Sequence, residues 1–187
     1  LQNLIKWFVE ENYDQDVGLV IKTSIKNNCV VDREYTLDLI KSCVSNYSDR
    51  VCKIYLLHGY LNDEEMNGLY THPKIKAFVS ATHGEGYGRP LAEATCCDLP
   101  VIASGWSGHM DFLNDKESLF INGFLKEVPK SALWPPIVVE PSKWFNVQES
   151  DVIRKFRLFH KKEKLITKKA KRLGKKNRRE KSLKAMT

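Results

Sequence analysis

Two glutamates and a cluster of glycines lie close together in the stretch HGEGYGRPLAEA, residues 83–94, where they could bind a polar ligand. Glu85 and Glu93 follow the pattern E-x7-E. The glycines around the first glutamate are Gly84, Gly86 and Gly88. Glycines let a backbone approach a ligand closely, and Pro90 is typical of the first turn of a helix, where free N–H groups form an anion site. The segment therefore favours the binding of a diphosphate by backbone amides.

The carboxylates of this segment indicate a second kind of ligand group. In a dry site, repulsion between Glu85 and a diphosphate would cost roughly a few kcal/mol, so Glu85 should face hydroxyl groups, for which a carboxylate is a strong acceptor. Glu93 lies in the first turn of the expected helix, where the helix dipole stabilises it, and it can accept a pair of hydroxyls such as a ribose offers. A diphosphate between two polyols describes a nucleotide sugar.

Alternating strand and helix patterns place this segment at the edge of a sheet. We expect helices in residues 1–12, 32–47, 62–72 and 90–97, and strands in residues 17–23, 51–59, 75–81 and 100–104. This order predicts the α/β class, a Rossmann-like parallel sheet with helices on both faces. Ligands of such sheets collect at the carboxyl ends of the strands, where residues 83–94 begin. Residues 118–150 are rich in Pro and Trp and are expected to form a long ordered surface excursion.

Length and composition are those of a globular protein. The 187 residues suffice for one compact domain, and 42% of them are hydrophobic, enough to bury a core. No apolar run approaches the roughly 20 residues that span a bilayer, and the N-terminus does not resemble a signal peptide. The five cysteines are odd in number and include no C-x-x-C, which favours reduced thiols and a cytoplasmic location.

The net charge of +7 is unevenly distributed. Residues 151–187 hold 16 Lys and Arg against 3 Asp and Glu, a net charge of +13, which leaves −6 for residues 1–150. We therefore expect a nucleotide-sugar-binding domain in residues 1–150 and a basic amphipathic helix and tail in residues 151–187. An apolar stripe at helical spacing favours packing of this helix: Val152, Phe156, Phe159, Ile166, Ala170 and Leu173. The stretch GKKNRREK from Gly174 lacks the stripe and is expected to fray.

The stretch from Val79 to Leu113 resembles the donor-binding core of the retaining, group 1 (family 4 type) glycosyltransferases. These enzymes have the GT-B fold, in which two Rossmann-like domains face each other across a cleft. The matching residues are Glu85, Gly86, Tyr87, Gly88, Pro90, Glu93, Pro100, Val101, Ile102, Ala103 and Ser104. The resemblance implies that Glu85 contacts the donor sugar and is the catalytic residue of this half. It also implies that the amides of residues 86–88 and Leu91 bind the diphosphate and that Glu93 binds the ribose.

Complete enzymes of that family are about twice as long. The resemblance therefore implies a C-terminal donor-binding domain that lacks its first strand and is separated from an N-terminal acceptor-binding domain. Lys22 is the best remaining cation for the phosphates, with Arg89 as a second candidate. His83 could reach the diphosphate or the sugar, and His58 could approach the base. No metal or other cofactor is expected. Asp14 and Asp16 resemble the metal-binding D-x-D motif of another glycosyltransferase fold, but there the carboxylates follow an apolar strand, whereas these precede one.

Two other interpretations stay open. A sugar-nucleotide epimerase or phosphorylase has the same fold and would convert the nucleotide sugar without an acceptor. A nucleic-acid-binding protein is less favoured, and it would use the basic tail, with an affinity that falls steeply with salt. The same tail could bind an anionic membrane surface. The residues do not identify the sugar, the base or the acceptor.

Overall fold

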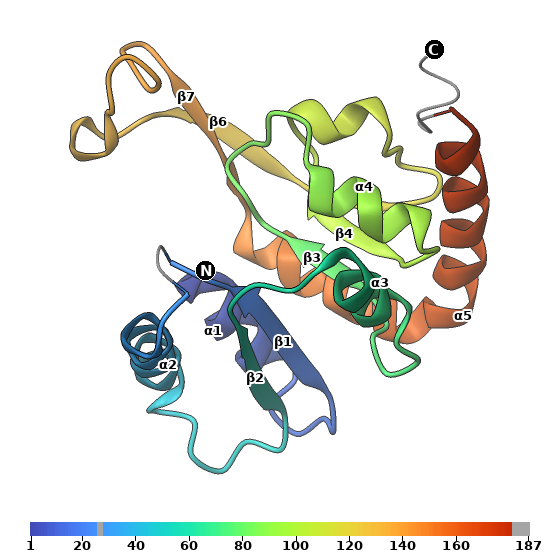
Figure 1. The fold of residues 1–187 in the computed structure, drawn as a ribbon, viewed down its shortest axis with the longest axis horizontal. Coiled ribbons are helices and arrows are strands. Elements are labelled where there is room, and N and C mark those ends of the chain that lie inside the picture. The colour runs from blue at the N-terminus through green and yellow to red at the C-terminus, as the bar shows by residue number, and fades with distance from the viewer. Residues whose placement is uncertain (26–27, 181–187) are drawn as a thin grey trace. The chain divides into compact units, whose positions relative to one another are not determined.

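The computed structural model describes residues 1–25 and 28–180 of the chain (Figure 1). The chain forms two compact units, Leu1–Met66 and Asn67–Thr187, and the boundary between them lies within helix α3 (Asp63–Thr71). Among the described residues, no helix has both the length and the apolar composition that crossing a membrane requires. All five cysteines are free thiols.

The first unit contains a parallel strand pair and two helices. Its elements are α1 (Gln2–Glu11), β1 (Gly18–Thr23), α2 (Val30–Val44) and β2 (Lys53–His58). The two strands run parallel, with Gly18 opposite Lys53 and Thr23 opposite His58. Helix α1 packs against α2 and buries four side chains: Ile5, Trp7, Phe8 and Val9. The carboxyl ends of both strands therefore meet at one edge, where Lys22 and His58 lie.

The second unit contains a three-stranded parallel sheet and an antiparallel pair. Its elements after α3 are β3 (Phe78–Ser80), α4 (Arg89–Cys96), β4 (Val101–Ser104), the 3-10 turn η1 (Gly108–Asp111), β5 (Leu119–Ile121), β6 (Gly123–Glu127), the 3-10 turn η2 (Lys130–Ala132), β7 (Lys143–Val147) and α5 (Glu149–Glu180). The parallel order is β3-β4-β5, and β6 pairs with β7.

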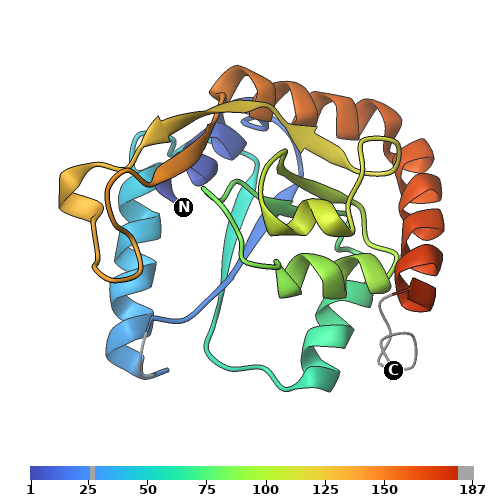
Figure 2. The same cartoon turned by 90° about the horizontal axis from the view of Figure 1, so that it is seen from above.

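Strand β4 is the centre of this sheet and is buried along its whole length. Helix α4 and the first half of α5 lie on opposite faces of the sheet (Figure 2). From α4, Leu91 and Ala94 are buried, and from β5, Ile121 is buried. Parallel strands that alternate with helices confirm the predicted α/β class, and the predicted C-terminal helix is present.

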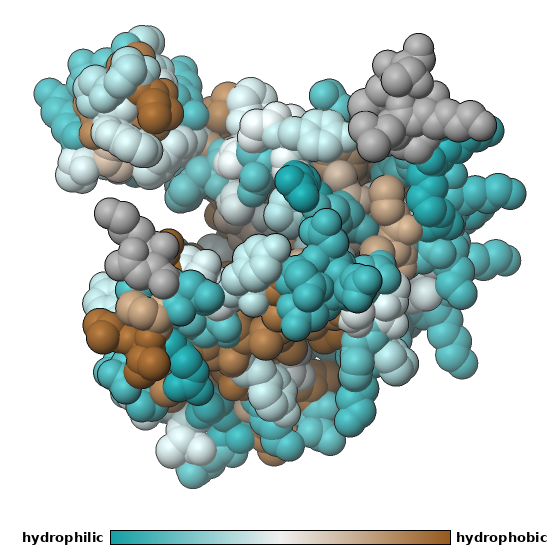
Figure 3. All heavy atoms as spheres, viewed as in Figure 1, coloured by the Kyte–Doolittle hydropathy of each residue, from teal (hydrophilic) through white to brown (hydrophobic). Residues whose placement is uncertain are grey.

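The expectation that residues 118–150 form a long ordered surface excursion agrees with the β6–β7 arm but is wrong for β5. Strand β5 joins the parallel sheet beside β4, and β6 and β7 form a two-stranded arm that projects from the unit (Figure 1). The sequence pattern is weak because β5 has only three residues and because β6 has no buried residue on either face. The arm exposes apolar side chains, part of which Figure 3 shows: Phe124, Leu125, Trp134, Ile137 and Val139.

Helix α5 packs through the apolar stripe that the sequence predicts. All six positions of the stripe are buried: Val152, Phe156, Phe159, Ile166, Ala170 and Leu173. The outward surface of the helix is hydrophilic (Figure 3). At its start, Asp151 accepts hydrogen bonds from the Asn122 N–H and from Arg154 Nε, each at 2.6 Å. Burial favours the neutral form of Asp151, but these bonds outweigh it and lower the pKa of the carboxyl.

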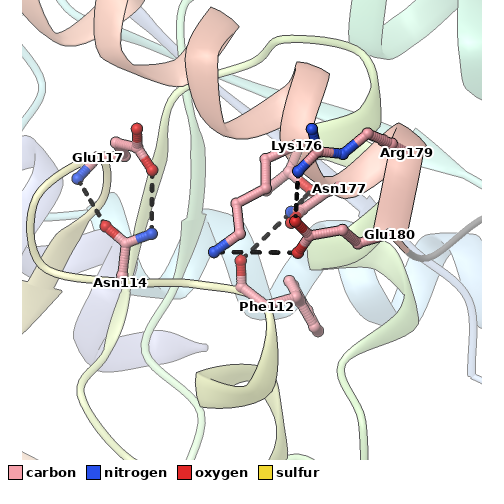
Figure 4. Close-up of polar contacts among 8 residues, drawn as sticks. Phe112, Asn114, Glu117, Lys176, Asn177, Arg179 and Glu180 are labelled. Carbon is pink, nitrogen blue, oxygen red and sulfur yellow. Dashed lines mark hydrogen bonds and ion pairs between the residues drawn. The ribbon is translucent and has the colours of Figure 1, made fainter.

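The expected fraying from Gly174 onward is wrong, because α5 stays helical to Glu180. Gly174 and Asn177 are both buried. The side-chain amide of Asn177 donates to Thr95 Oγ1 at 2.9 Å. It also donates to the Phe112 carbonyl at 3.3 Å (Figure 4). Arg178 forms an ion pair with Asp98 at 2.7 Å. The last turns of α5 are therefore held by the close approach of Gly174 to the end of α4 and by polar contacts. Neither can be predicted from a pattern of apolar residues.

We predict that Gly174→Ala destabilises the second unit. A Cβ at this position would lie 2.5 Å from the Thr95 carbonyl oxygen and would also overlap the Asp98 carboxylate, so α5 must move away from the end of α4. The expected loss is about 1–3 kcal/mol in the free energy of unfolding, measured by urea denaturation.

Gly68→Ala is the matched control, since Gly68 also lies within a helix and a Cβ there would meet no atom within 4 Å. This variant should gain roughly 0.5–1 kcal/mol from helix propensity. Equal stability changes for the two variants would contradict the packing described for α5.

Candidate functional site

The loop between β3 and α4 carries the E-x7-E segment at the carboxyl end of β3. It ends at Gly88, the N-cap residue of α4, whose φ of 82° is in the left-handed region. A Cβ on Gly88 would lie 3.1 Å from both the His109 Cβ and the Leu91 Cδ1. Pro90 lies in the first turn, and no side chain caps the helix. The start of α4 thus has the arrangement that the sequence predicts for an anion site.

A second loop, at the carboxyl end of β4, holds the main chain of Glu85. Ser107 Oγ accepts a hydrogen bond from the Glu85 N–H at 3.0 Å and donates one to the Glu85 carbonyl at 2.7 Å. The Gly108 N–H donates to the same carbonyl at 3.0 Å. We call these three bonds the Ser107 clasp. Because one hydroxyl bonds both polar groups of the Glu85 backbone, the clasp fixes where this residue lies.

The clasp also requires close contact between two glycine-containing segments. A Cβ on Gly108 would lie 1.8 Å from the Gly86 carbonyl oxygen, a distance that no side chain could keep. A Cβ on Gly86, in contrast, would meet no atom within 4 Å. Open space at Gly86 leaves room for a ligand beside the loop, whereas Gly108 is needed for packing.

His83 connects the loop to the arm. Its main chain accepts a hydrogen bond from the Phe145 N–H at 3.0 Å, and its Nδ1 lies 2.9 Å from the Phe145 carbonyl. Since a carbonyl only accepts, Nδ1 carries the proton. The imidazole stacks on Trp144 with ring centroids 4.8 Å apart and planes 6° apart. The role expected of His83 at a diphosphate or sugar stays a prediction, and Nε2 is the ring nitrogen that this geometry leaves for it.

Glu93 is the fifth residue of α4, so the expectation that it lies in the first turn is wrong. It has protein partners of its own. Arg89 Nε donates to its carboxylate at 2.8 Å. On the other side, burial raises the pKa of Tyr70 to about 12, and the charge of Glu93 and a hydrogen bond to it contribute in the same direction. A ribose at this position would share the carboxylate with Arg89 and Tyr70, and the expected role of Glu93 stays a prediction.

Lys22 and His58 belong to the first unit, whereas the two loops of the clasp belong to the second. The Lys22 ammonium donates to the Gly59 carbonyl. The Nε2 atom of His58 is buried and has no hydrogen-bond partner among the residues that the structure describes. The two side chains lie near the same carboxyl edge of β1 and β2, and their roles toward phosphates and a base stay predictions. Within residues 1–25 and 28–180, no three His, Cys, Asp or Glu side chains converge as metal ligands.

The site residues expected from the sequence do not include Ser107, Gly108 or His109, which lie in the loop after β4. His109 is fully buried, and its Nε2 lies 2.6 Å from the Ser104 carbonyl. The signal in the sequence is Ser107 between Gly105 and Gly108, shortly after the buried strand β4. Its partner lies 22 residues away, so only the fold connects the two.

Comparisons with known proteins found one family model and several similar folds. Residues 53–133 match the family model of the glycosyl transferases group 1. That range includes the E-x7-E segment and the Ser107 clasp. No curated protein matches the sequence.

Several solved structures have a similar fold. One is Anabaena HepE in complex with UDP and glucose, with a TM-score of 0.61 and 13% identity over 93% of this chain. A second is a glycosyltransferase from Rickettsia africae, with a TM-score of 0.59 and 16% identity over 94% of this chain. This chain spans 39% of the length of each.

A third similar structure is the C-terminal domain of a glycosyl transferase group 1 family protein (LpcC) from Francisella tularensis. Its TM-score is 0.50 at 15% identity, with 91% of this chain and 90% of that domain covered. These likenesses show that the fold is similar to one half of a GT-B glycosyltransferase.

We predict that Gly108→Ala displaces the loop that carries Glu85. The added methyl group would overlap the Gly86 carbonyl, so the clasp must open, at a cost of about 1–3 kcal/mol in the free energy of unfolding. Two-dimensional NMR should show a large shift of the Glu85 amide, which donates to Ser107 Oγ in the clasp.

Gly86→Ala is the control from the same loop, and it should leave the stability nearly unchanged and shift the Glu85 amide much less, because its Cβ meets no atom within 4 Å. If Gly108→Ala leaves the Glu85 amide where it is in the parent, the clasp does not position this residue.

Proposed function

We propose that this chain is the donor-binding half of a retaining glycosyltransferase and binds a nucleoside-diphosphate sugar. The observation that carries the proposal is the fixed position of Glu85, held by the Ser107 clasp beside the start of α4. The match of residues 53–133 to the glycosyl transferases group 1 supports it. The similar fold of the Anabaena protein, whose structure contains UDP and glucose, supports this class of donor.

In this proposal the diphosphate binds to backbone amides. The N–H groups of residues 86–88 and of Leu91 face the phosphates, where the dipole of α4 adds a partial positive charge. Glu85 then accepts hydrogen bonds from hydroxyls of the donor sugar, and Glu93 accepts those of the ribose. The space beside Gly86 suits a close approach of the ligand.

The chemistry assigned to this half is stabilisation of the leaving group. As the bond from the anomeric carbon to the diphosphate breaks, negative charge grows on the diphosphate, and amides already oriented toward it lower the barrier. A cationic side chain of the same unit, Arg89, is a candidate for the same stabilisation, and the proposal needs no metal ion. Likeness to the C-terminal domain of the Francisella protein supports the assignment of the donor half, and the acceptor site is assigned to the other half of such an enzyme.

We predict that two glutamine substitutions separate the sugar from the nucleotide. Glu93→Gln should weaken binding of both UDP and UDP-glucose about tenfold, or about 1.4 kcal/mol, because the ribose is common to both ligands. Glu85→Gln should leave UDP binding unchanged and remove the additional affinity that the sugar provides. Isothermal titration calorimetry measures both effects.

Glu127→Gln is the control, because Glu127 is exposed on the β6–β7 arm. It should bind both ligands as the parent does. Equal losses for UDP and UDP-glucose in the Glu85 variant would contradict the role assigned to Glu85. Conversion of the nucleotide sugar without an acceptor would favour an epimerase instead.

A further inference from the structure

An exposed tryptophan lies one residue before the Ser107 clasp. Trp106 follows the carboxyl end of β4, and 42% of its surface is exposed. Its ring stacks on Phe145, with centroids 6.3 Å apart and planes 12° apart. Phe145 itself is buried. Phe145 thus supports the indole from one side, while a large part of the Trp106 side chain stays open to solvent.

The backbone on both sides of Trp106 is held in place. On one side, the Gly105 N–H donates to the Ile121 carbonyl of β5 at 3.0 Å. On the other side, the Ser107 clasp bonds the loop to Glu85. With the near-parallel contact to Phe145 as well, the indole is oriented before any ligand arrives, so less conformational entropy is lost when one binds.

The surroundings of this ring indicate the class of ligand that it suits. Ligand sites typically combine aromatic surface with a few fixed polar groups. A pyranose ring has an apolar face of C–H groups and an edge of hydroxyls, so it needs a flat apolar surface next to a hydrogen-bond acceptor. Trp106 offers the flat surface. Glu85, whose backbone is bonded to the next residue, Ser107, offers a carboxylate as the acceptor. A second exposed aromatic ring, Tyr87, follows Glu85 in the same loop.

We propose that Trp106 is a stacking platform for a pyranose ring of the substrate and thereby a specificity-determining residue. This inference rests on the proposed function and adds the residue that binds the apolar face of the sugar. The ring can belong to the donor or to the acceptor, and the shared chemistry is the C–H face of a hexose. Trp134 differs from Trp106, because it is 67% exposed on the arm and is not adjacent to the clasp.

The test compares two replacements of Trp106 in the whole chain. Trp106→Phe keeps a flat ring on Phe145, whereas Trp106→Leu keeps apolar contact but removes the flat face. Trp134→Leu is the matched control. Calorimetry measures the affinity of each for UDP, UDP-glucose and methyl α-D-glucopyranoside, and thermal unfolding checks that all variants fold.

We expect Trp106→Leu to bind UDP as the parent does and to lose tenfold or more in affinity for a sugar-containing ligand. Trp106→Phe should lose threefold or less, and Trp134→Leu should match the parent. A loss confined to UDP-glucose assigns the ring to the donor, and a loss confined to the free glucoside assigns it to the acceptor.

Two results would overturn the platform. One is parental affinity of Trp106→Leu for both sugar ligands, and the other is an equal loss for plain UDP, which would indicate stacking of the base. If the parent binds neither UDP nor UDP-glucose, the proposed function fails on its own. In that case the titration with the glucoside tests the role of Trp106. If the parent and Trp106→Leu bind the glucoside equally weakly, or if neither binds it, the platform is overturned too.

Discussion

One serine hydroxyl, bonded to both the amide and the carbonyl of Glu85, is the contact on which the geometry of this site depends. It joins the loop after β3 to the loop after β4, and parallel strands bring those loops to the same edge of the sheet. This contact requires a glycine at position 108, because the Gly86 backbone lies where a Cβ of residue 108 would be. Because the main chain of Glu85 is fixed before a ligand binds, less conformational entropy is lost when its carboxylate accepts bonds from ligand hydroxyls.

Strand β7 is the second support of the same loops, although it comes from the segment richest in Pro and Trp. Its main chain pairs with His83, while its adjacent aromatic residues, Trp144 and Phe145, stack on His83 and Trp106. Successive side chains of a strand point to opposite sides, so one strand can contact both loops. The arm is thus a structural part of the site at its base and an exposed apolar extension beyond it.

Local patterns were sufficient to predict the alternation of strands and helices, the loop at the end of β3 and the six buried positions of α5. They failed where stability comes from distant partners. Strand β5 is too short to show a period, and the last turns of α5 depend on a close approach at Gly174 and on the amide of Asn177. The Ser107 clasp could not be predicted either, because a serine in a glycine-rich loop has no visible partner until the sheet brings Glu85 beside it.

The most direct test of the central claim is to locate bound UDP on this chain by NMR. The account predicts that the largest amide shifts fall on residues 84–88 and 105–108, with further shifts at the start of α4, and that they persist at 0.3 M salt because directional hydrogen bonds from the amides contribute to binding. Shifts confined to the basic outward face of α5 that disappear at that salt concentration would contradict it, since they would reduce the interaction to screened attraction between a polyanion and surface lysines.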